Sequence, residues 1–539
     1  MNFRTRRYPS PPVDYPVESF TEQERAQLRP HFSNLDRPVF ALINLPETVK
    51  GALFARYSRY PGTLRRLFLD EFAEDLNDAP AADYDRAGSE RAAALYERIF
   101  LGYGDDSVAQ LGGAHIACEW VSNVLTKILQ RPRLGAYLEQ STRYIAYDSP
   151  LPGGGYRYYR DAELGPEYKV AMDQLFEIYS ASLPRVAAWA EQEFPLEPGE
   201  QPAAHARAIK AKALDLLRGL LPASSLSHMG IFASGQTYEQ LILHLLAHPL
   251  PEARRYGEMI LQEIKAVMPS FVARVERPDR GGEWIEHLRS RARAGEHWAR
   301  RLELHDPQRA EETRPSVTLL SVEGDEDDLL SALLFESAGV SERELRDTVS
   351  QLDDDTKARM LTDLVGERAN RRHRPGRGFE ALRYRFEIVS DYGAFRDLQR
   401  HRMLTVQWQT LTPDLGAGVP DQVKLAGVGD DYRRALEISR REYERQGSAQ
   451  QAIYALCLGY RIRYILDLNA REAMQLIELR SGREGHPSYR AVAHEMHAQI
   501  AAVHPAVAAA MTHVDDETEP RLERILSEMR SHARAASQS

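Results

Sequence analysis

The spacing of apolar residues predicts a mainly helical chain between about residues 37 and 271. The segments KALDLLRGLLP and YEQLILHLLAH carry apolar residues three and four positions apart, which is the period of an amphipathic helix. Two stretches that contain proline and glycine interrupt this pattern at 149–166 and 195–202, and we expect them to be loops. After Gly485 the chain is expected to be helical again.

A different pattern, with a period of two, predicts one strand. Apolar residues occupy every second position from Leu382 to Ile388, with charged residues between them, as in a half-buried strand. The acidic run GDEDD at 324–328 predicts the start of a helix, because aspartates are favourable near the positive N-terminal end.

Composition and charge narrow the function classes. The chain has 539 residues, 43% of them hydrophobic and 27% charged, which predicts a folded chain of several domains. Two cysteines outside any CxxC pair, and no signal peptide or membrane segment, indicate a cytoplasmic protein. A net charge of −10 argues against a nucleic-acid binder, whereas a local arginine cluster could still bind a small anion.

The expected organisation has four parts. A proline-containing arm covers residues 1–36, and a polar bridge near 305–315 separates a first unit at 37–304 from a second at 305–515. A frayed tail follows at 516–539. No metal site is expected, because AHEMHAQI has two histidines without the HExxH spacing.

A faint internal repeat relates the two units. The segment RPRLGAYLEQSTRY begins at Arg131 and resembles RHRMLTVQWQTLTP, which begins at Arg400. Each is followed by a long amphipathic helix, and the first copy carries extra residues between the two segments. We expect this insertion to lie within 149–202.

Three groups of polar residues are candidates for chemistry. The tripeptide 400–402, with two arginines around His401, suits a phosphate, although a solvated helix face has the same composition. The group Glu139, Ser141 and Arg143 suits a loop that grips a nucleotide, or equally a helix cap with a salt bridge.

The third group lies on the helix DLNAREAMQLIELR. Asn469 and Arg480 share one face, about 16 Å apart, while Arg471 and Gln475 lie one turn apart on the far side. A phosphate could bind at the start of this helix. Alternatively, Asn469 is an ordinary N-cap, and Arg471, Gln475 and Glu478 face solvent.

These residues together resemble a tandem duplication of the flavin-dependent thymidylate synthase family. The family signature is R-H-R-x-x-S-x-N-E-x-S-x-R-Y. Two elements follow it along the chain: an arginine shortly before an L-P pair, and then an N-A-R element with another arginine nine residues on. The second copy matches the R-H-R and N-A-R parts, and the first matches the E-x-S-x-R loop and the L-P arginine, Arg218. Each copy has lost what the other kept, as in Pro132 against His401 and Trp408 against Glu139.

The resemblance implies one composite site per chain. The family shares each site between subunits, so the implied substrate-binding residues are Glu139, Ser141, Arg143, Arg218 and Arg400. The catalytic residue would be Arg480, and the flavin-binding residues would be Arg400, His401, Arg402, Asn469, Arg471 and Gln475. One departure is Asp397, where the family has a glutamine, because an acidic group disfavours a nearby phosphate.

The resemblance also implies a fold, a reaction and partners. The fold would be α/β (α+β), with a mixed sheet flanked by long helices in each unit. The reaction would methylate dUMP to dTMP, with FAD as cofactor and with methylenetetrahydrofolate and NADPH as co-substrates. A homodimer would imitate the family's tetramer. The alternatives are a relative that acts on another pyrimidine nucleotide and a degenerate, non-catalytic flavin- or nucleotide-binding protein.

Overall fold

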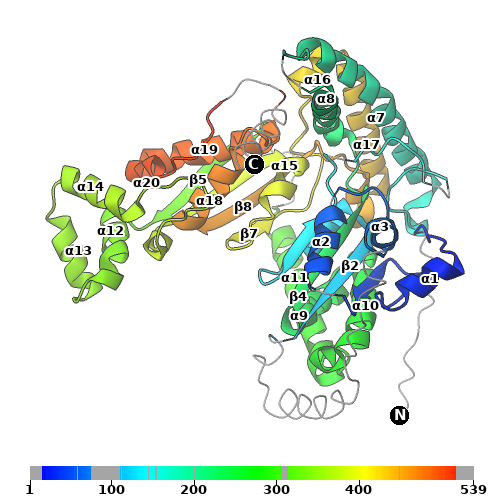
Figure 1. Cartoon of the computed structure of the whole chain (residues 1–539), viewed down its shortest axis with the longest axis horizontal. Helices are drawn as coiled ribbons and strands as arrows, with labels where there is room; N and C mark the ends of the chain where they lie inside the picture. Colours follow the sequence, from blue (N-terminus) through cyan, green and yellow to red (C-terminus); the bar gives the residue numbers. More distant parts are fainter. Residues whose placement is uncertain are drawn as a thin grey trace. The chain divides into compact units, whose positions relative to one another are not determined.

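The computed structural model of the chain describes residues 15–45, 47–57, 59–73, 110, 112–143, 145–151, 154–198, 201–304, 314–447, 450–517 and 522 (Figure 1). The start of the expected arm, most of the expected tail and the core of the polar bridge, 305–313, lie outside these residues. The chain divides into two units. Unit 1 comprises Met1–Ser180, Leu221–Asp306 and Glu437–Leu456, and unit 2 comprises Ala181–Leu220, Pro307–Leu436 and Cys457–Ser539.

Unit 1 is built on a four-stranded sheet of order β1-β2-β4-β3. Its strands are β1 (Val39–Leu42), β2 (Gly113–Ser122), β3 (Ala136–Glu139) and β4 (Leu226–Ser234). The main helices of this unit are α1 (Glu22–Leu28), α2 (Glu47–Tyr57), α3 (Leu64–Glu71), α6 (Asn123–Leu129), α9 (Gly235–Ala247), α10 (Pro251–Val267), α11 (Glu283–Arg301) and the first half of α7 (Gly165–Glu193).

The helical pattern expected across 37–271 is wrong for β2 and β4, the two central strands of this sheet. Eight consecutive residues of β2 are buried, and β4 is buried at seven of its nine positions. A strand covered on both faces has no polar alternation, so its sequence cannot be distinguished from that of a buried helix by period alone.

Unit 2 is built on a second sheet, of order β5-β6-β8-β7. Its strands are β5 (Ser316–Glu323), β6 (Arg383–Asp391), β7 (Thr405–Trp408) and β8 (Arg461–Asn469). The strand expected around Leu382–Ile388 is confirmed as β6, and the acidic run begins α12 with Asp325 as a side-chain cap. The helices are α8 (Pro202–Leu217), α12 (Glu326–Leu334), α13 (Glu342–Ser350), α14 (Asp354–Val365), α15 (Tyr392–Leu398), α16 (Asp421–Leu425), α18 (Ala470–Arg480), α19 (Pro487–Val503), α20 (Pro505–Ala509) and the first part of α17 (Gly429–Gln446).

The two sheets have the same strand order and the same register at the aligned positions. Glu139 of β3 pairs with Met229, five residues before the N-cap Ser234 of α9. Trp408 of β7 pairs with Tyr464, five residues before the N-cap Asn469 of α18. The internal alignment that set Glu139 against Trp408 therefore corresponds to equivalent places in the two sheets.

Two segments belong to the compact unit that contains the sheet of the other repeat. Ala181–Leu220, which ends in the short 3-10 helix η5 (Arg218–Leu220), belongs to unit 2, whereas Glu437–Leu456 belongs to unit 1. The units therefore do not coincide with the contiguous stretches 37–304 and 305–515. As a result, the L-P arginine of the first repeat, Arg218, lies in the unit that holds the R-H-R and N-A-R segments of the second.

The α/β class is confirmed, with helices around both sheets. One detail is corrected, because the strand pairs recorded within the two sheets are antiparallel and not mixed in direction. In unit 2, for example, β6 leads into α15 and β8 leads into α18 from opposite ends of the sheet. None of the described helices is long and apolar enough to cross a bilayer.

Candidate functional site

Arg218 and Asp397 form a buried ion pair in unit 2. Arg218 begins η5 directly after α8, and Asp397 lies in the last turn of α15. Nη1 of Arg218 donates to Oδ2 of Asp397 over 3.2 Å, and only 4% of Arg218 is exposed. Its Nε and Nη2 have no hydrogen-bond partner among the described residues. A buried guanidinium with unused donors is costly, so this arginine is suited to receive an anionic ligand.

Asp397 faces further arginines. Nη1 of Arg400 lies 3.7 Å from its Oδ1, and Asp397 also raises the pKa of Arg480 against the effect of burial. The three arginines carry more positive charge than the single carboxylate of Asp397 removes. The repulsion expected between Asp397 and a phosphate is therefore reduced, because the positive charges of Arg218 and Arg400 compensate the negative charge of this carboxylate.

Arg480, His401 and Glu472 form a buried chain of polar contacts. Nε of Arg480 donates to Nε2 of His401 over 3.0 Å, and Nδ1 of His401 lies 3.4 Å from Oε1 of Glu472. Since an arginine can only donate, Nε2 must be the unprotonated nitrogen. The proton of the neutral ring is therefore on Nδ1 and points at Glu472.

Burial sets the protonation of this chain. It lowers the pKa of His401, and the charge of Arg480 acts in the same direction while Glu472 opposes it. Burial also lowers the pKa of Arg480, which stays charged because an arginine starts far above neutral pH. At neutral pH the site thus combines a neutral imidazole with a fixed guanidinium cation.

The start of α18 holds the remaining residues of the second repeat. Asn469 caps the helix, with its Oδ1 accepting from the backbone N–H of Glu472 over 2.9 Å. Nε of Arg471 donates to the carbonyl of Pro375 over 3.0 Å, and its Nη1 lies 3.5 Å from Glu380. Arg471 is half-buried. Asn469 is thus an N-cap, as one of the two alternatives had it.

Further residues of this group differ in their exposure. Arg402 and Gln475 are half-buried. Glu478, which the simpler alternative placed in solvent, is instead buried and paired with Arg368 at 2.6 Å. The two hydrogen bonds that Arg368 donates to this carboxylate explain the difference, because they compensate its burial.

The first repeat's loop lies in unit 1. The carboxylate of Glu139 is buried, with its Oε2 2.9 Å from Nζ of Lys127 and accepting from Nε2 of Gln130 over 2.9 Å. The hydroxyl oxygen of Ser141 accepts from the backbone N–H of Arg143 over 3.2 Å. Ser141 and Arg143 are half-buried. Lys127 and Gln130 therefore hold the carboxylate of Glu139 in place.

Two residues that support the site were not among those predicted from the sequence. Glu472 contacts His401, and Lys127 contacts Glu139. Glu472 lies three residues after the cap Asn469, at the spacing of a capping box, which is a detectable signal. Lys127 lies twelve residues before Glu139, and no local pattern links the two.

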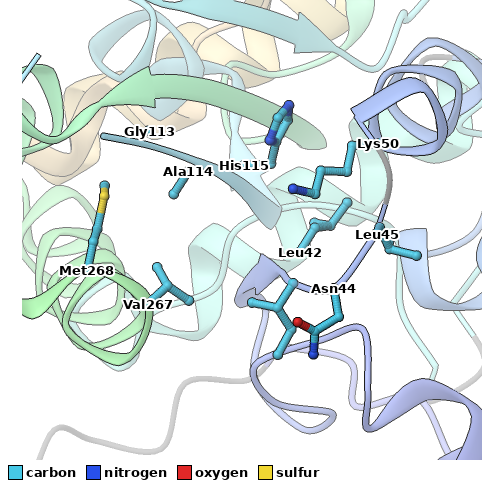
Figure 2. A pocket seen from close by; sticks show the side chains of 10 residues that line it. Leu42, Asn44, Leu45, Lys50, Gly113, Ala114, His115, Val267 and Met268 are labelled. Atoms are coloured by element: carbon cyan, nitrogen blue, oxygen red, sulfur yellow. The ribbon is translucent and has the colours of Figure 1, made fainter. Parts of the chain in front are cut away.

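Two cavities add context. In unit 2 a cavity of about 220 Å³ adjoins Arg218, and Asp391, Arg461 and His486 also line it. In unit 1 a cavity of about 380 Å³ is lined by apolar side chains together with Asn44, Lys50 and His115 (Figure 2). None of the predicted site residues lines the second cavity, whereas the first includes Arg218.

Two histidines of α19 contact the backbone. Nε2 of His494 lies 2.7 Å from the carbonyl oxygen of Asp515, and Nε2 of His497 lies 3.3 Å from that of Ala508. Both rings are half-buried. Each ring is thus held by a local carbonyl, as on a polar helix face.

Two sheets of equal strand order, with an arginine-rich centre beside one of them, define an α/β chain built from two related units. The chain belongs to the thymidylate synthase complementing protein family, whose sequence model matches residues 65–270 and 326–506. This confirms the family resemblance drawn from the motifs. Membership supports a thymidylate synthase-like function and an enzyme of the methyltransferase type.

Relatives match the chain along most of its length. It is 37% identical over 538 residues to a UPF0159 protein of Chlamydia muridarum (strain MoPn / Nigg), covering 95% of this chain and 99% of that protein. A UPF0159 protein of Thermoplasma acidophilum is 31% identical, covering 90% and 99%. A solved structure of the UMP/dUMP methylase PolB from Streptomyces cacaoi, bound with 5-Br dUMP, is 20% identical with a TM-score of 0.30, covering 37% of this chain and 96% of that one.

Proposed function

We propose that the chain methylates dUMP to dTMP in a flavin-dependent reaction, at one composite site per chain. The proposal rests mainly on the position of Arg218, a first-repeat residue that is buried beside Asp397 of the second repeat. Two nitrogens of its guanidinium have no hydrogen-bond partner among the described residues. Family membership supplies the reaction class. The arginine cluster supplies the positive charge that a nucleotide phosphate needs.

The phosphate would bind to Arg218 and Arg400 of unit 2 together with Arg143 of unit 1. Asp397 would hold the first two arginines in position and balance part of their charge while no nucleotide is bound. Ser141 would bind the nucleotide beside Arg143. Glu139, whose carboxylate is held by Lys127, would orient that loop.

Arg480 would act on the uracil ring. A fixed cation beside the ring stabilises the negative charge that develops on a uracil as its C5 carbon reacts. His401 would hold the Arg480 guanidinium by accepting its Nε–H, and Tyr489 would support it from the side, so that an Nη group can reach the substrate. Glu472 would fix the tautomer of His401 that makes this possible.

Reduced FAD, when bound, would supply the hydride, methylenetetrahydrofolate would supply the carbon, and NADPH would be the reductant. The donor set at α18 fits the anionic diphosphate of FAD, because Arg471 lies at the positive N-terminal end of the helix. Four further arginines, at 371, 372, 374 and 377, are exposed in the segment between α14 and β6. Arg402, Asn469 and Gln475 would complete the flavin site, and His401 would contribute mainly through Arg480, since both its ring nitrogens already have partners.

Growth of a thymidine auxotroph tests this function directly. The intact chain should restore growth without thymidine, and the purified protein should be yellow with a flavin spectrum that shifts on adding dUMP. The Arg480→Ala chain should remain yellow and fail to restore growth. A colourless protein, or a folded yellow protein that neither shifts with dUMP nor supports growth, would favour the non-catalytic alternative.

A further inference from the structure

We propose that a cationic cleft in unit 1 binds the phosphate group of a nucleotide-sized molecule, and that this is a second ligand site. The cleft has a volume of about 840 Å³. Its walls come from the end of β2, from the loop around residues 151–160, from the start of α7, and from the segments 16–19 and 61–63. None of its lining residues belongs to the site proposed above. We call it the Arg157 cleft.

Three cations line the Arg157 cleft without an acidic partner. They are Arg157, Arg160 and Lys169. Arg160 donates to the backbone carbonyls of Tyr156 at 2.7 Å and Tyr158 at 3.4 Å and lies 4.0 Å from the ring centre of Tyr158, and the ammonium of Lys169 has no ion pair with a described residue. The cleft therefore carries three positive charges that the described residues leave unneutralised.

The one acidic residue that lines the cleft is already engaged. Glu18 accepts from Nε of Arg66 over 2.7 Å and from the hydroxyl of Thr63. Asp173, one turn after Lys169 on α7, accepts from the hydroxyl of Tyr158 over 2.9 Å. Neither carboxylate forms an ion pair with Arg157, Arg160 or Lys169, so among the described residues these three cations stay open to an external anion.

Arg157 contributes a buried guanidinium to the wall of the cleft. Only 7% of this residue is exposed, and its Nε has no hydrogen-bond partner among the described residues. Its guanidinium lies 5.1 Å from the ring centre of Trp120 and donates through Nη2 to the side chain of Gln140. An arginine buried among aromatic rings and an amide, with a donor unused, is an expensive arrangement unless a ligand completes it.

Two backbone features shape the wall. Trp120 has a φ of +58° at a bulge in β2, a strained conformation for a bulky residue. Gly155 has a φ of +75°, which other residues rarely adopt, and a Cβ there would crowd the guanidinium of Arg160. Strain of this kind persists where the surrounding structure holds it, commonly at ligand sites.

The chemistry of these donors identifies a phosphate. Guanidinium groups bind phosphate oxygens through paired N–H donors, and a nearby ammonium adds a point charge. The cleft volume falls within the range of sites that enclose a whole small molecule, and it exceeds what inorganic phosphate needs. The expected ligand is therefore a phosphomonoester of nucleotide size, such as a nucleoside monophosphate.

Acetylation of lysines in the full-length protein, read by mass spectrometry, tests the site without requiring flavin or turnover. Lys169 is exposed and reports on the cleft, while Lys210, exposed on α8, is the matched control. Uridine monophosphate should slow acetylation of Lys169 and leave Lys210 unchanged. Uridine, which lacks the phosphate, should protect neither lysine.

Variants separate the cleft from other effects. Arg160→Gln should raise the nucleotide concentration for half-protection by about tenfold or more, whereas Arg343→Gln, at an exposed arginine of α13, should leave it unchanged. If inorganic phosphate at the same concentration protects Lys169 as well as uridine monophosphate does, the cleft binds phosphate, and its ligand is the free anion and not a nucleotide. No protection of Lys169 by either anion, or equal protection by uridine, would overturn the proposal. Because the readout is local, failure of the dUMP reaction would leave it standing.

Discussion

Arg480, the last residue of α18, donates its Nε–H to Nε2 of His401 over 3.0 Å, and His401 lies three residues after the end of α15. The other ring nitrogen of His401 faces Glu472, in the first turn of the same helix. The histidine therefore ties the two ends of α18 together through one side chain. The Arg480 guanidinium is thus held by His401 on one side, while the ring of Tyr489 lies 5.5 Å from its central carbon on another.

Removing the Arg480 guanidinium should stop the reaction and spare the flavin. We expect Arg480→Ala to lower kcat by about 100-fold or more, the usual cost of losing one preorganised donor, while the bound flavin stays near one per site. Arg480→Lys should also fail, because an ammonium cannot both donate to His401 and present two further donors in a plane. The control is Arg433→Ala, at an exposed arginine of α17. Full activity in Arg480→Ala would remove the role given to it.

Replacing Asp397 with the glutamine expected at this position in the family should shift the balance between stability and binding. Asp397→Gln leaves the buried Arg218 without its counter-ion, so the unliganded protein should lose about 3 kcal/mol of unfolding free energy. The same change removes negative charge beside the phosphate and should tighten dUMP binding several-fold. Calorimetry and thermal unfolding with and without dUMP measure both effects. Weaker dUMP binding in a folded variant would show that Asp397 contacts the nucleotide favourably.

The buried histidines should make the fold sensitive to mild acid. Burial lowers the pKa of His401 and of His228 below the ordinary 6.5, with Arg157 contributing at His228. Below that value the unfolded chain takes up protons that the folded chain excludes, so stability falls as the pH falls, by up to about 1.4 kcal/mol per pH unit for each histidine. Urea denaturation between about pH 7 and 5 measures the slope.

A matched variant assigns part of this acid sensitivity. In His228→Asn the new side-chain oxygen can accept from the backbone N–H of Trp120, as Nδ1 does now. The variant cannot take up a proton, so its slope should be shallower than that of the parent. An unchanged slope would mean that His228 does not contribute.

The pair Glu139 and Lys127 allows a structural role to be separated from a role in nucleotide binding. Glu139→Gln removes the carboxylate that pairs with the buried Lys127 and should cost about 3–5 kcal/mol of stability. Adding Lys127→Met removes the stranded charge and should restore most of that stability. If Glu139 orients the nucleotide loop, the double variant should fold well and still bind dUMP poorly. Normal dUMP binding in the double variant would limit Glu139 to holding the fold.

Local patterns in the sequence were enough to locate several elements. The alternation from Leu382 to Ile388 predicted β6, and an N-cap was one of the two alternatives that the position of Asn469 before the apolar helix offered. The alignment of the two repeats set Glu139 against Trp408, and both occupy the same register in their sheets. These signals depend on residues close together in sequence or on direct comparison of two segments, which is why they could be read.

Long-range packing was beyond such patterns. The buried strands β2 and β4 have no alternation, and their pairing joins residues more than one hundred positions apart. The placement of Arg218 with Asp397, 179 residues later, follows from the exchange of Ala181–Leu220 into unit 2. Only the family resemblance suggested that this arginine serves the second repeat, and the contact with Asp397 could not be derived from spacing.

The central claim is that the first repeat's loop and the second repeat's arginines serve one nucleotide. A crystal structure of the protein with dUMP tests it most directly. We predict a dUMP with its phosphate on Arg218 and Arg400, its uracil at Arg480, and Ser141 and Arg143 of a 139–143 loop against the same molecule. A dUMP bound at Arg480 with no contact to any residue of that loop would contradict the account.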